Sequence, residues 1–184
     1  MDGKINFYTL GRDVAIKRKI PSKRLFSTFQ ISRNIDYKSL LENIDDLYSY
    51  LVTEYEKNLE TVPLSASWIL ENYYLINQQS AVFSETFKTG ILSKLPLSEY
   101  DKVYFQIHYI AKKYLEAVSY NFSEETLIPF LKGYQKIYPL SSLELWILPT
   151  MIKFELFSSI LERGLEIKEK IEKNGKPLKD WDVK

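Results

Sequence analysis

Hydrophobic residues recur at spacings of three and four along much of this chain, which is the pattern of helices with one apolar face. The clearest case is a predicted helix from about Asp36 to Asn58, followed by the break ETVPLS. Its stripe consists of Tyr37, Leu40, Ile44, Leu47, Leu51 and Tyr55. A second helix is predicted from about Ser65 to Phe87. It carries Trp68, Ile69, Tyr73, Ile76 and Phe83. We expect both aromatic-rich stripes to pack in the core.

Two more helices are predicted after the connection GILSKLPLS, in which Gly90 and Pro96 act as breakers. One opens at Ser98 and Asp101, which have the spacing of a capping box. Its stripe consists of Val103, Ile107, Ala111, Tyr114 and Val118. The next follows Ser123, and the acidic residues of its first turn, Glu124 and Glu125, suit the positive end of the helix dipole. Its apolar residues are Leu127, Phe130, Leu131 and Tyr134.

A fifth helix is predicted from SLELWILPTMIKFELFSSIL, residues 142–161, to about Lys173. Ser141 and Glu144 form a capping box at its start, and Pro149 is expected to kink it or to end a short first segment. Lys153 and Glu155 lie within its apolar run, so a buried helix is favoured over a membrane span.

Trp146 lies one turn into this helix, and we expect it to fill core space beside the Pro149 kink. On this interpretation Trp146→Ala leaves a marginal or aggregating protein, because replacing a core aromatic residue by alanine costs about 3–5 kcal/mol. His108→Ala is expected to have a modest effect.

The fold class predicted from these patterns is all-α. Only 6 glycines occur, and no segment except KINFYTL near the start alternates with period two. We expect a helical bundle of about five helices with an irregular basic N-terminal arm. The predicted organisation is an arm over residues 1–33, a single helical domain over 34–175 and a polar tail over 176–184.

The composition excludes some kinds of chemistry and bears on location and partners. The absence of cysteine excludes disulfides, thiolate catalysis and cysteine-ligated metals. The N-terminal stretch has no apolar core of a signal peptide, so the cytoplasm is the expected location. A net charge of +1 gives no global field that would attract nucleic acid or anionic lipid.

The arm itself is basic. Its eight lysines and arginines are Lys4, Arg12, Lys17, Arg18, Lys19, Lys23, Arg24 and Arg33. Residues 12–24 could neutralise the phosphates of nucleic acid or of anionic lipid. The favoured interpretation is a solvated or docking segment, because the rest of the chain is net acidic and can pair with it; nucleic acid is therefore not the expected partner.

No residue is assigned a catalytic, cofactor-binding or metal-binding role, and no cofactor is expected. His108 is the only histidine and is expected to be packed or hydrogen-bonded. Asp45 and Asp46 are adjacent on a helix and point in different directions. The segment GRDVAIKRK lacks the pattern of a phosphate-binding loop.

The segment WILENYYLINQQ places polar groups beside an aromatic row. These polar residues are Glu71, Asn72, Asn77, Gln78 and Gln79. Aromatic faces with amide side chains are typical of surfaces that bind carbohydrate. The favoured interpretation is a helix whose outer residues are polar.

Two blocks, SASWILENYYLINQQ and LIPFLKGYQKIYPLSSLELWILPTMIKFELFSSIL, resemble the N-terminal region of cyclic β-1,2-glucan synthetases. That family has a Trp-Leu-x-Asp/Glu-Asn-Phe/Tyr-x-x-Ile/Val run, then Phe-x-x-x-Tyr-Gln, a Pro-Leu turn and Glu-Leu-Trp-x-Leu-Pro. The resemblance covers about residues 63–163. The matching positions are Trp68, Glu71, Asn72, Tyr73, Phe130, Tyr134, Gln135, Pro139, Leu140, Glu144, Leu145, Trp146, Leu148 and Pro149.

The resemblance implies a non-catalytic helical module that supports or docks to a glycosyltransferase domain or protein. Those synthetases are large inner-membrane enzymes that use UDP-glucose, and their catalytic domains lie after the matched segment. The letters DWD at 180–182 fit an Asp-x-Asp nucleotide-binding motif but lie in a polar tail, so we discount them. We expect no transfer from UDP-glucose by the chain alone and association with the inner membrane only through a partner. The alternative is a stand-alone helical protein-interaction module whose basic arm meets a partner or nucleic acid.

Overall fold

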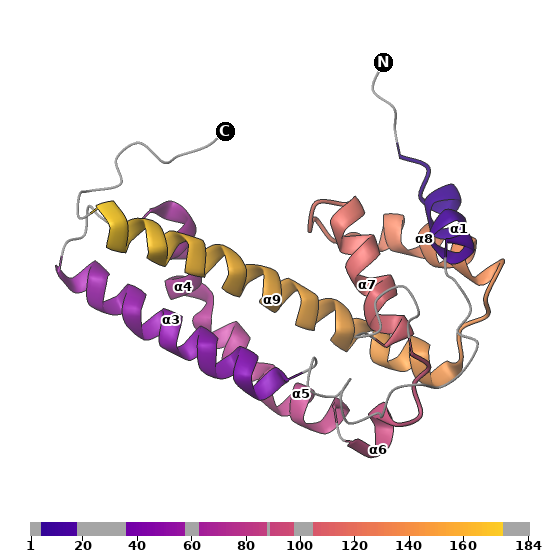
Figure 1. Cartoon of the computed structure of the whole chain (residues 1–184), viewed down its shortest axis with the longest axis horizontal. Helices are drawn as coiled ribbons and strands as arrows, with labels where there is room; N and C mark the ends of the chain where they lie inside the picture. Colours follow the sequence, from indigo (N-terminus) through magenta and orange to yellow (C-terminus); the bar gives the residue numbers. More distant parts are fainter. Residues whose placement is uncertain (1–4, 18–35, 58–62, 88, 98–104, 175–184) are drawn as a thin grey trace. The chain divides into compact units, whose positions relative to one another are not determined.

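The computed structural model describes residues 5–17, 36–57, 63–87, 89–97 and 105–174, and almost all of its regular structure is helical (Figure 1). The helices of these ranges are α1 (Phe7–Ile16), α3 (Tyr37–Lys57), α4 (Leu64–Gln78), α5 (Ser80–Thr86), α6 (Thr89–Leu92), α7 (Gln106–Ala117), α8 (Glu124–Gln135) and α9 (Ser142–Asn174). Within them, β pairing is limited to an isolated bridge between Leu97 and Phe105. The predicted all-α class is confirmed, but the count of about five helices is wrong.

The extra helices have local causes. The predicted second helix is interrupted at Gln79 and forms α4 and α5. The short α6 lies in the segment predicted as a connection. The N-terminal arm is helical over α1, so it is not irregular there. The side chain of Asn6 accepts a hydrogen bond from the backbone N–H of Thr9 at 3.1 Å and caps α1.

The chain divides into two compact units. The first unit comprises residues 1–35 and 86–156, and the second comprises residues 36–85 and 157–184. Helix α9 contributes its first part to the first unit and its remainder to the second. The domain boundaries predicted near residues 33 and 175 lie outside the described residues and stay predictions, as does the polar tail.

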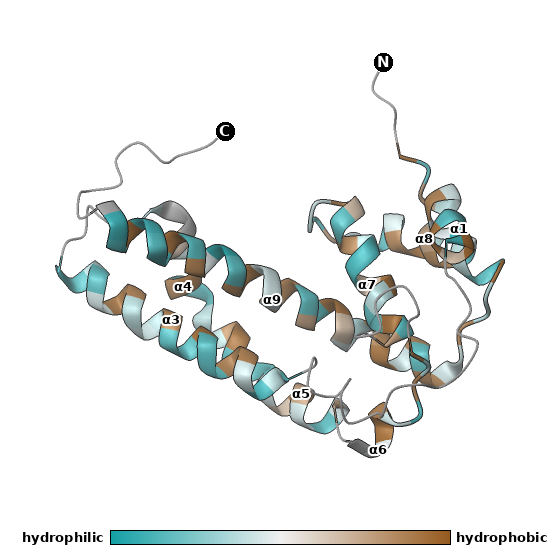
Figure 2. Ribbon diagram, viewed as in Figure 1, coloured by the Kyte–Doolittle hydropathy of each residue, from teal (hydrophilic) through white to brown (hydrophobic). Residues whose placement is uncertain are grey.

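In the second unit, α3, α4 and the second part of α9 pack on one another. The buried residues of this core are Leu47, Leu51, Ala66 and Ile69, with Ile160, Leu161, Ile167 and Ile171 packed against them. Figure 1 shows α3 and this part of α9 side by side, and Figure 2 shows brown and teal faces alternating around them. Gly164 makes the approach close, because a Cβ there would lie 2.2 Å from Leu47 Cδ2. The apolar stripe of α3 therefore forms as predicted over its central turns.

In the first unit, α1 packs on α8 (Figure 1). Two glycines lie at this contact. A Cβ on Gly11 would lie 1.9 Å from the carbonyl oxygen of Phe130, and one on Gly133 would lie 1.9 Å from that of Tyr8. Only glycine permits backbones this close. The predicted basic arm therefore packs on the rest of the first unit through its helix α1.

A tyrosine ties α7 to the start of α8. The hydroxyl of buried Tyr114 donates to the carbonyl oxygen of Ser123 at 2.8 Å and lies 2.8 Å from Thr126 Oγ1. The Ser123 hydroxyl accepts from the N–H of Glu125 at 3.2 Å, so the predicted helix start after Ser123 is confirmed. The capping-box spacing at Ser98 and Asp101 lies outside the described residues.

The start of α9 is confirmed, and one of the two alternatives predicted for Pro149 is wrong. Glu144 accepts from the N–H of Ser141 at 2.9 Å, and its own N–H donates to the Ser141 hydroxyl at 3.3 Å, which is a capping box. The helix continues through Pro149, so the predicted end of a short first segment is wrong. The carbonyl that loses its hydrogen-bond donor at Pro149 belongs to Leu145, a residue that is 41% exposed.

Three aromatic residues predicted to lie in the core are exposed. Trp146 is 57% exposed, Trp68 is 48% exposed and Tyr55 is 39% exposed. The prediction for Trp146 assumed that a kink would open space between helices. Instead Ile147, Leu148 and the following buried residues fill the inner face of α9, and Trp146 lies on the outer face.

Candidate functional site

The single histidine forms a buried polar pair. His108 on α7 is 1% exposed, and its Nε2 bonds to the Oε1 of Glu155 on α9, a residue that is 6% exposed. The Phe154 ring meets the imidazole edge-on at 5.4 Å. The prediction that His108 is packed and hydrogen-bonded is confirmed. Because the pair is enclosed by the core of the first unit, it is an internal stabilising contact and not an open catalytic site.

A second buried polar contact joins α7 to α8. The side-chain amide of Gln106 donates to the Tyr134 hydroxyl, and both residues are buried. Tyr134 is one of the residues that carry the resemblance, and so is Phe130, which is also fully buried. Part of the motif is therefore explained by packing within the first unit.

Three further residues of the motif form an exposed apolar stripe on the first part of α9. Leu145, Trp146 and Pro149 are all exposed and lie on one face of the helix, because they are spaced by one, three and four residues. Glu144 and Leu148 of the same motif are buried. We call the three exposed residues the α9 stripe. Exposed apolar residues gathered on one face are typical of surfaces that bind another protein.

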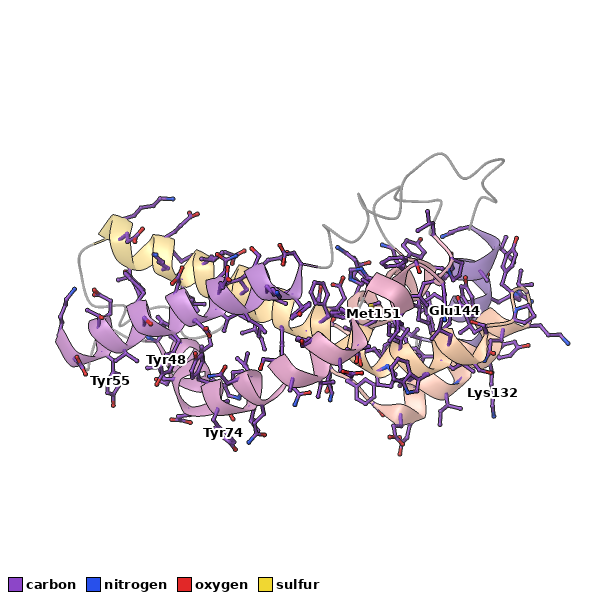
Figure 3. The ribbon with its side chains drawn as sticks, turned by 90° about the horizontal axis from the view of Figure 1, so that it is seen from below. Tyr48, Tyr55, Tyr74, Lys132, Glu144 and Met151 are labelled. Carbon is purple, nitrogen blue, oxygen red and sulfur yellow. The ribbon has the colours of Figure 1, made fainter. Side chains whose placement is uncertain are left out.

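The second unit carries a groove between α3 and α4. Its cavity volume is about 450 Å³. The lining residues are Tyr48, Val52, Tyr55, Glu56, Ser67, Leu70 and Glu71. Figure 3 labels Tyr48 and Tyr55 along α3 and Tyr74 on α4. Each helix contributes one carboxylate and at least one apolar side chain, so both charged and apolar ligand groups could contact this α3–α4 groove.

A tyrosine pair supports the groove. The rings of Tyr48 and Tyr73 stack with centroids 3.8 Å apart and an interplanar angle of 11°. The Tyr73 hydroxyl donates to Asp45 Oδ1 at 2.6 Å. This hydrogen bond, with partial burial and the Asp45 charge, raises the pKa of Tyr73 to about 12. Tyr48 is thereby held in place by a neighbour whose phenol stays protonated at neutral pH.

The other predicted candidates lie apart from the groove or have local roles. Asp45 and Asp46 are both exposed, and only Asp45 accepts the hydrogen bond of Tyr73, so the two carboxylates do not act as one pair. Asn72 uses its amide to donate to the carbonyl of Trp68 at 2.8 Å. Asn77 and Gln78 are exposed, and Gln79 lies at the break between α4 and α5.

The basic arm and the tail are largely outside the described residues. Arg12 and Lys17 are described and are exposed at α1. The other six basic residues of the arm, and the DWD letters at 180–182, lie outside the described residues.

The described residues contain neither a candidate metal site nor a membrane-spanning helix. Within the described part of the chain, no group of three or more histidine, aspartate or glutamate side chains is placed to hold a metal ion. Among the described helices, none has the length and apolar character needed to cross a bilayer.

The sequence patterns missed the groove, although a signal for it was present. Tyr48, Val52, Tyr55 and Glu56 recur at spacings of four, three and one along α3, beside the core stripe and not within it. Tyr55 was assigned to the core stripe because it continues the spacing from Leu51. A second aromatic row next to a complete core stripe indicates a partly exposed face.

The chain matches no model of a known protein family, no curated protein and no solved structure.

Proposed function

We propose that this chain is a non-catalytic helical module that docks, through the α9 stripe, to a glycosyltransferase domain of the kind found in cyclic β-1,2-glucan synthetases. The observation that carries the proposal is the exposure of Leu145, Trp146 and Pro149 within the motif on which the resemblance rests. Packing explains why the inner residues of that motif are apolar. It does not explain an outward-facing tryptophan, and a partner surface does.

The test measures binding between the whole chain and a purified glycosyltransferase domain of a cyclic β-1,2-glucan synthetase, by biolayer interferometry. We expect Trp146→Ser to weaken binding at least about tenfold, because exposed tryptophans that become buried in interfaces are common hot spots. The matched control is Ile128→Ser, which removes a 50% exposed apolar residue of α8 outside the motif and should leave binding unchanged.

Both variants should unfold within about 0.5 kcal/mol of the parent, since neither side chain is buried. Absence of binding by the parent chain, or an equal loss in both variants, would contradict the proposal.

The alternative of a stand-alone interaction module draws support from one observation. Arg12 on α1 and Lys17 at its C-terminal cap are exposed, and α1 packs closely on α8 at Gly11 and Gly133. Two basic side chains held in this way could present charge to an acidic partner. In that case Arg12→Glu would weaken partner binding and Trp146→Ser would not.

A further inference from the structure

The α3–α4 groove has the residues of a site for a positively charged ligand. Glu56 of α3 and Glu71 of α4 both line it, and Tyr48 and Tyr55 add aromatic rings. No lysine, arginine or histidine is among the lining residues. Two carboxylates that face one cavity without a cation create a negative potential there, and this potential favours a cationic ligand.

The two carboxylates are not neutralised within the described part of the chain. Neither Glu56 nor Glu71 has a salt bridge to a described residue. Glu54, which is also on α3, does form a salt bridge. Its Oε1 lies 2.8 Å from Lys57 Nζ. Within the described residues, therefore, no cation neutralises the negative charge of the groove.

The second unit already binds a cation with the same kinds of side chain. Lys168 of α9 places its ammonium nitrogen 4.8 Å from the centroid of the Tyr50 ring. Burial, followed by the charges of Glu54 and Glu172, raises the pKa of Tyr50, so carboxylates stand near that ring too. A tyrosine face beside carboxylates thus holds a lysine within this unit. In the groove, the corresponding cation would have to come from outside the described chain.

The remaining lining residues favour a guanidinium on an aliphatic stem. Val52 and Leu70 offer apolar contact to methylene groups, and a planar guanidinium can stack on a tyrosine while it donates two hydrogen bonds to a carboxylate. A neutral sugar carries no charge that could pair with the two exposed carboxylates. We propose that the α3–α4 groove binds an arginine side chain presented by a partner protein. This inference does not rest on the proposed docking of the α9 stripe.

The experiment titrates the full chain with the peptide acetyl-Gly-Arg-Gly-amide and follows the backbone amides by NMR. We expect shifts confined to residues 48–56 and 67–71, and weaker binding as the salt concentration rises. A peptide with citrulline in place of arginine keeps the shape and removes the charge, so it should cause no shifts. The lysine peptide should bind more weakly than the arginine peptide.

Variants test the assigned residues. Glu56→Gln combined with Glu71→Gln should weaken arginine-peptide binding about tenfold, on the scale of two partly exposed charged contacts. The matched control, Asp46→Asn, removes an exposed charge of α3 that does not line the groove and should change binding less than about twofold. Circular dichroism melting of each variant shows that the fold is kept.

Several results would overturn the proposal. Equal binding of the citrulline peptide would show that charge is not recognised, and equal binding of the lysine peptide would remove the preference for guanidinium. An equal loss in Asp46→Asn would mean that the peptide responds to overall charge alone. Tighter binding of a gluco-oligosaccharide at the same amides would assign the groove to a neutral carbohydrate.

Discussion

At the scale of single residues, the hydrogen bond of Tyr73 to Asp45 makes a contribution to stability that depends on pH. Its pKa is raised to about 12, mainly by its hydrogen bond to Asp45, whereas a tyrosine in the unfolded chain titrates near 10. The unfolded state therefore loses this proton first as pH rises. The stabilising contribution is fully present below pH 10 and declines as pH approaches 12.

We expect the free energy of unfolding of Tyr73→Phe to depend less on pH between about 10 and 12 than that of the parent. Urea unfolding at several alkaline pH values measures this difference. Asp45→Asn should lower the pKa of Tyr73 toward its ordinary value, as followed by NMR of the tyrosine ring carbons. Parallel stability curves for parent and Tyr73→Phe would show that the hydrogen bond is not kept in solution.

His108 and Glu155 give a second prediction, which revises the modest effect expected from the sequence for His108→Ala. Removing the imidazole leaves the Glu155 carboxylate buried without its Nε2 contact. Breaking a buried polar pair in this way typically costs about 3–5 kcal/mol.

The double variant His108→Leu with Glu155→Met should recover much of the loss, because no polar group of the pair then remains buried without its partner. Urea unfolding of His108→Leu, of Glu155→Met, of the double variant and of the parent gives the coupling energy. If the single losses simply add up in the double variant, the two side chains do not act as a pair.

At the scale of elements, the crossing of α1 and α8 depends on two glycines. A Cβ at Gly11 or Gly133 would lie 1.9 Å from a backbone oxygen of the other helix, so alanine at either position must separate the helices. We expect each substitution to destabilise the protein by at least about 1–3 kcal/mol, the usual cost of overpacking. Thermal unfolding by circular dichroism measures it.

Gly90→Ala in α6 is the matched control. A Cβ there meets nothing within 4 Å, and the residue is helical. This substitution should therefore stabilise the protein by about 0.4–1 kcal/mol through the unfolded state. A similar destabilisation at Gly90 and at Gly133 would show that loss of backbone freedom, and not the helix crossing, dominates.

The elements also show what the sequence could predict. The core stripe of α3 and the caps of α8 and α9 follow from local spacing and local hydrogen bonds, and these were confirmed. Helix α1 was missed because it packs on α8 where Gly11 approaches the backbone of Phe130 and Gly133 that of Tyr8, contacts between residues far apart in the chain. Trp146 and Trp68 were misplaced because a hydrophobic residue at helical spacing need not face the core.

At the scale of the whole molecule, each unit has a core of its own. The first unit buries Ile110, Tyr114, Phe130 and Tyr134, and the second buries Ile44, Leu47, Leu51 and Ile76. Spacing along one chain predicts which faces are apolar, but it does not predict how helices group into separate cores. Nor does it predict the α3–α4 groove, which requires two helices to be placed side by side.

Separate cores predict separate local stabilities, although α9 contributes to both units. Gly133→Ala strains the first unit alone, so it should speed hydrogen exchange of the amides in α7 and α8. Exchange in α3 and α4 should change little. Hydrogen exchange followed by mass spectrometry measures both pairs of helices in one sample. If all four helices lose protection to the same degree, the chain opens cooperatively as the single helical domain of residues 34–175 that the sequence predicts. Unequal loss would instead mean that one unit can open while the other stays folded.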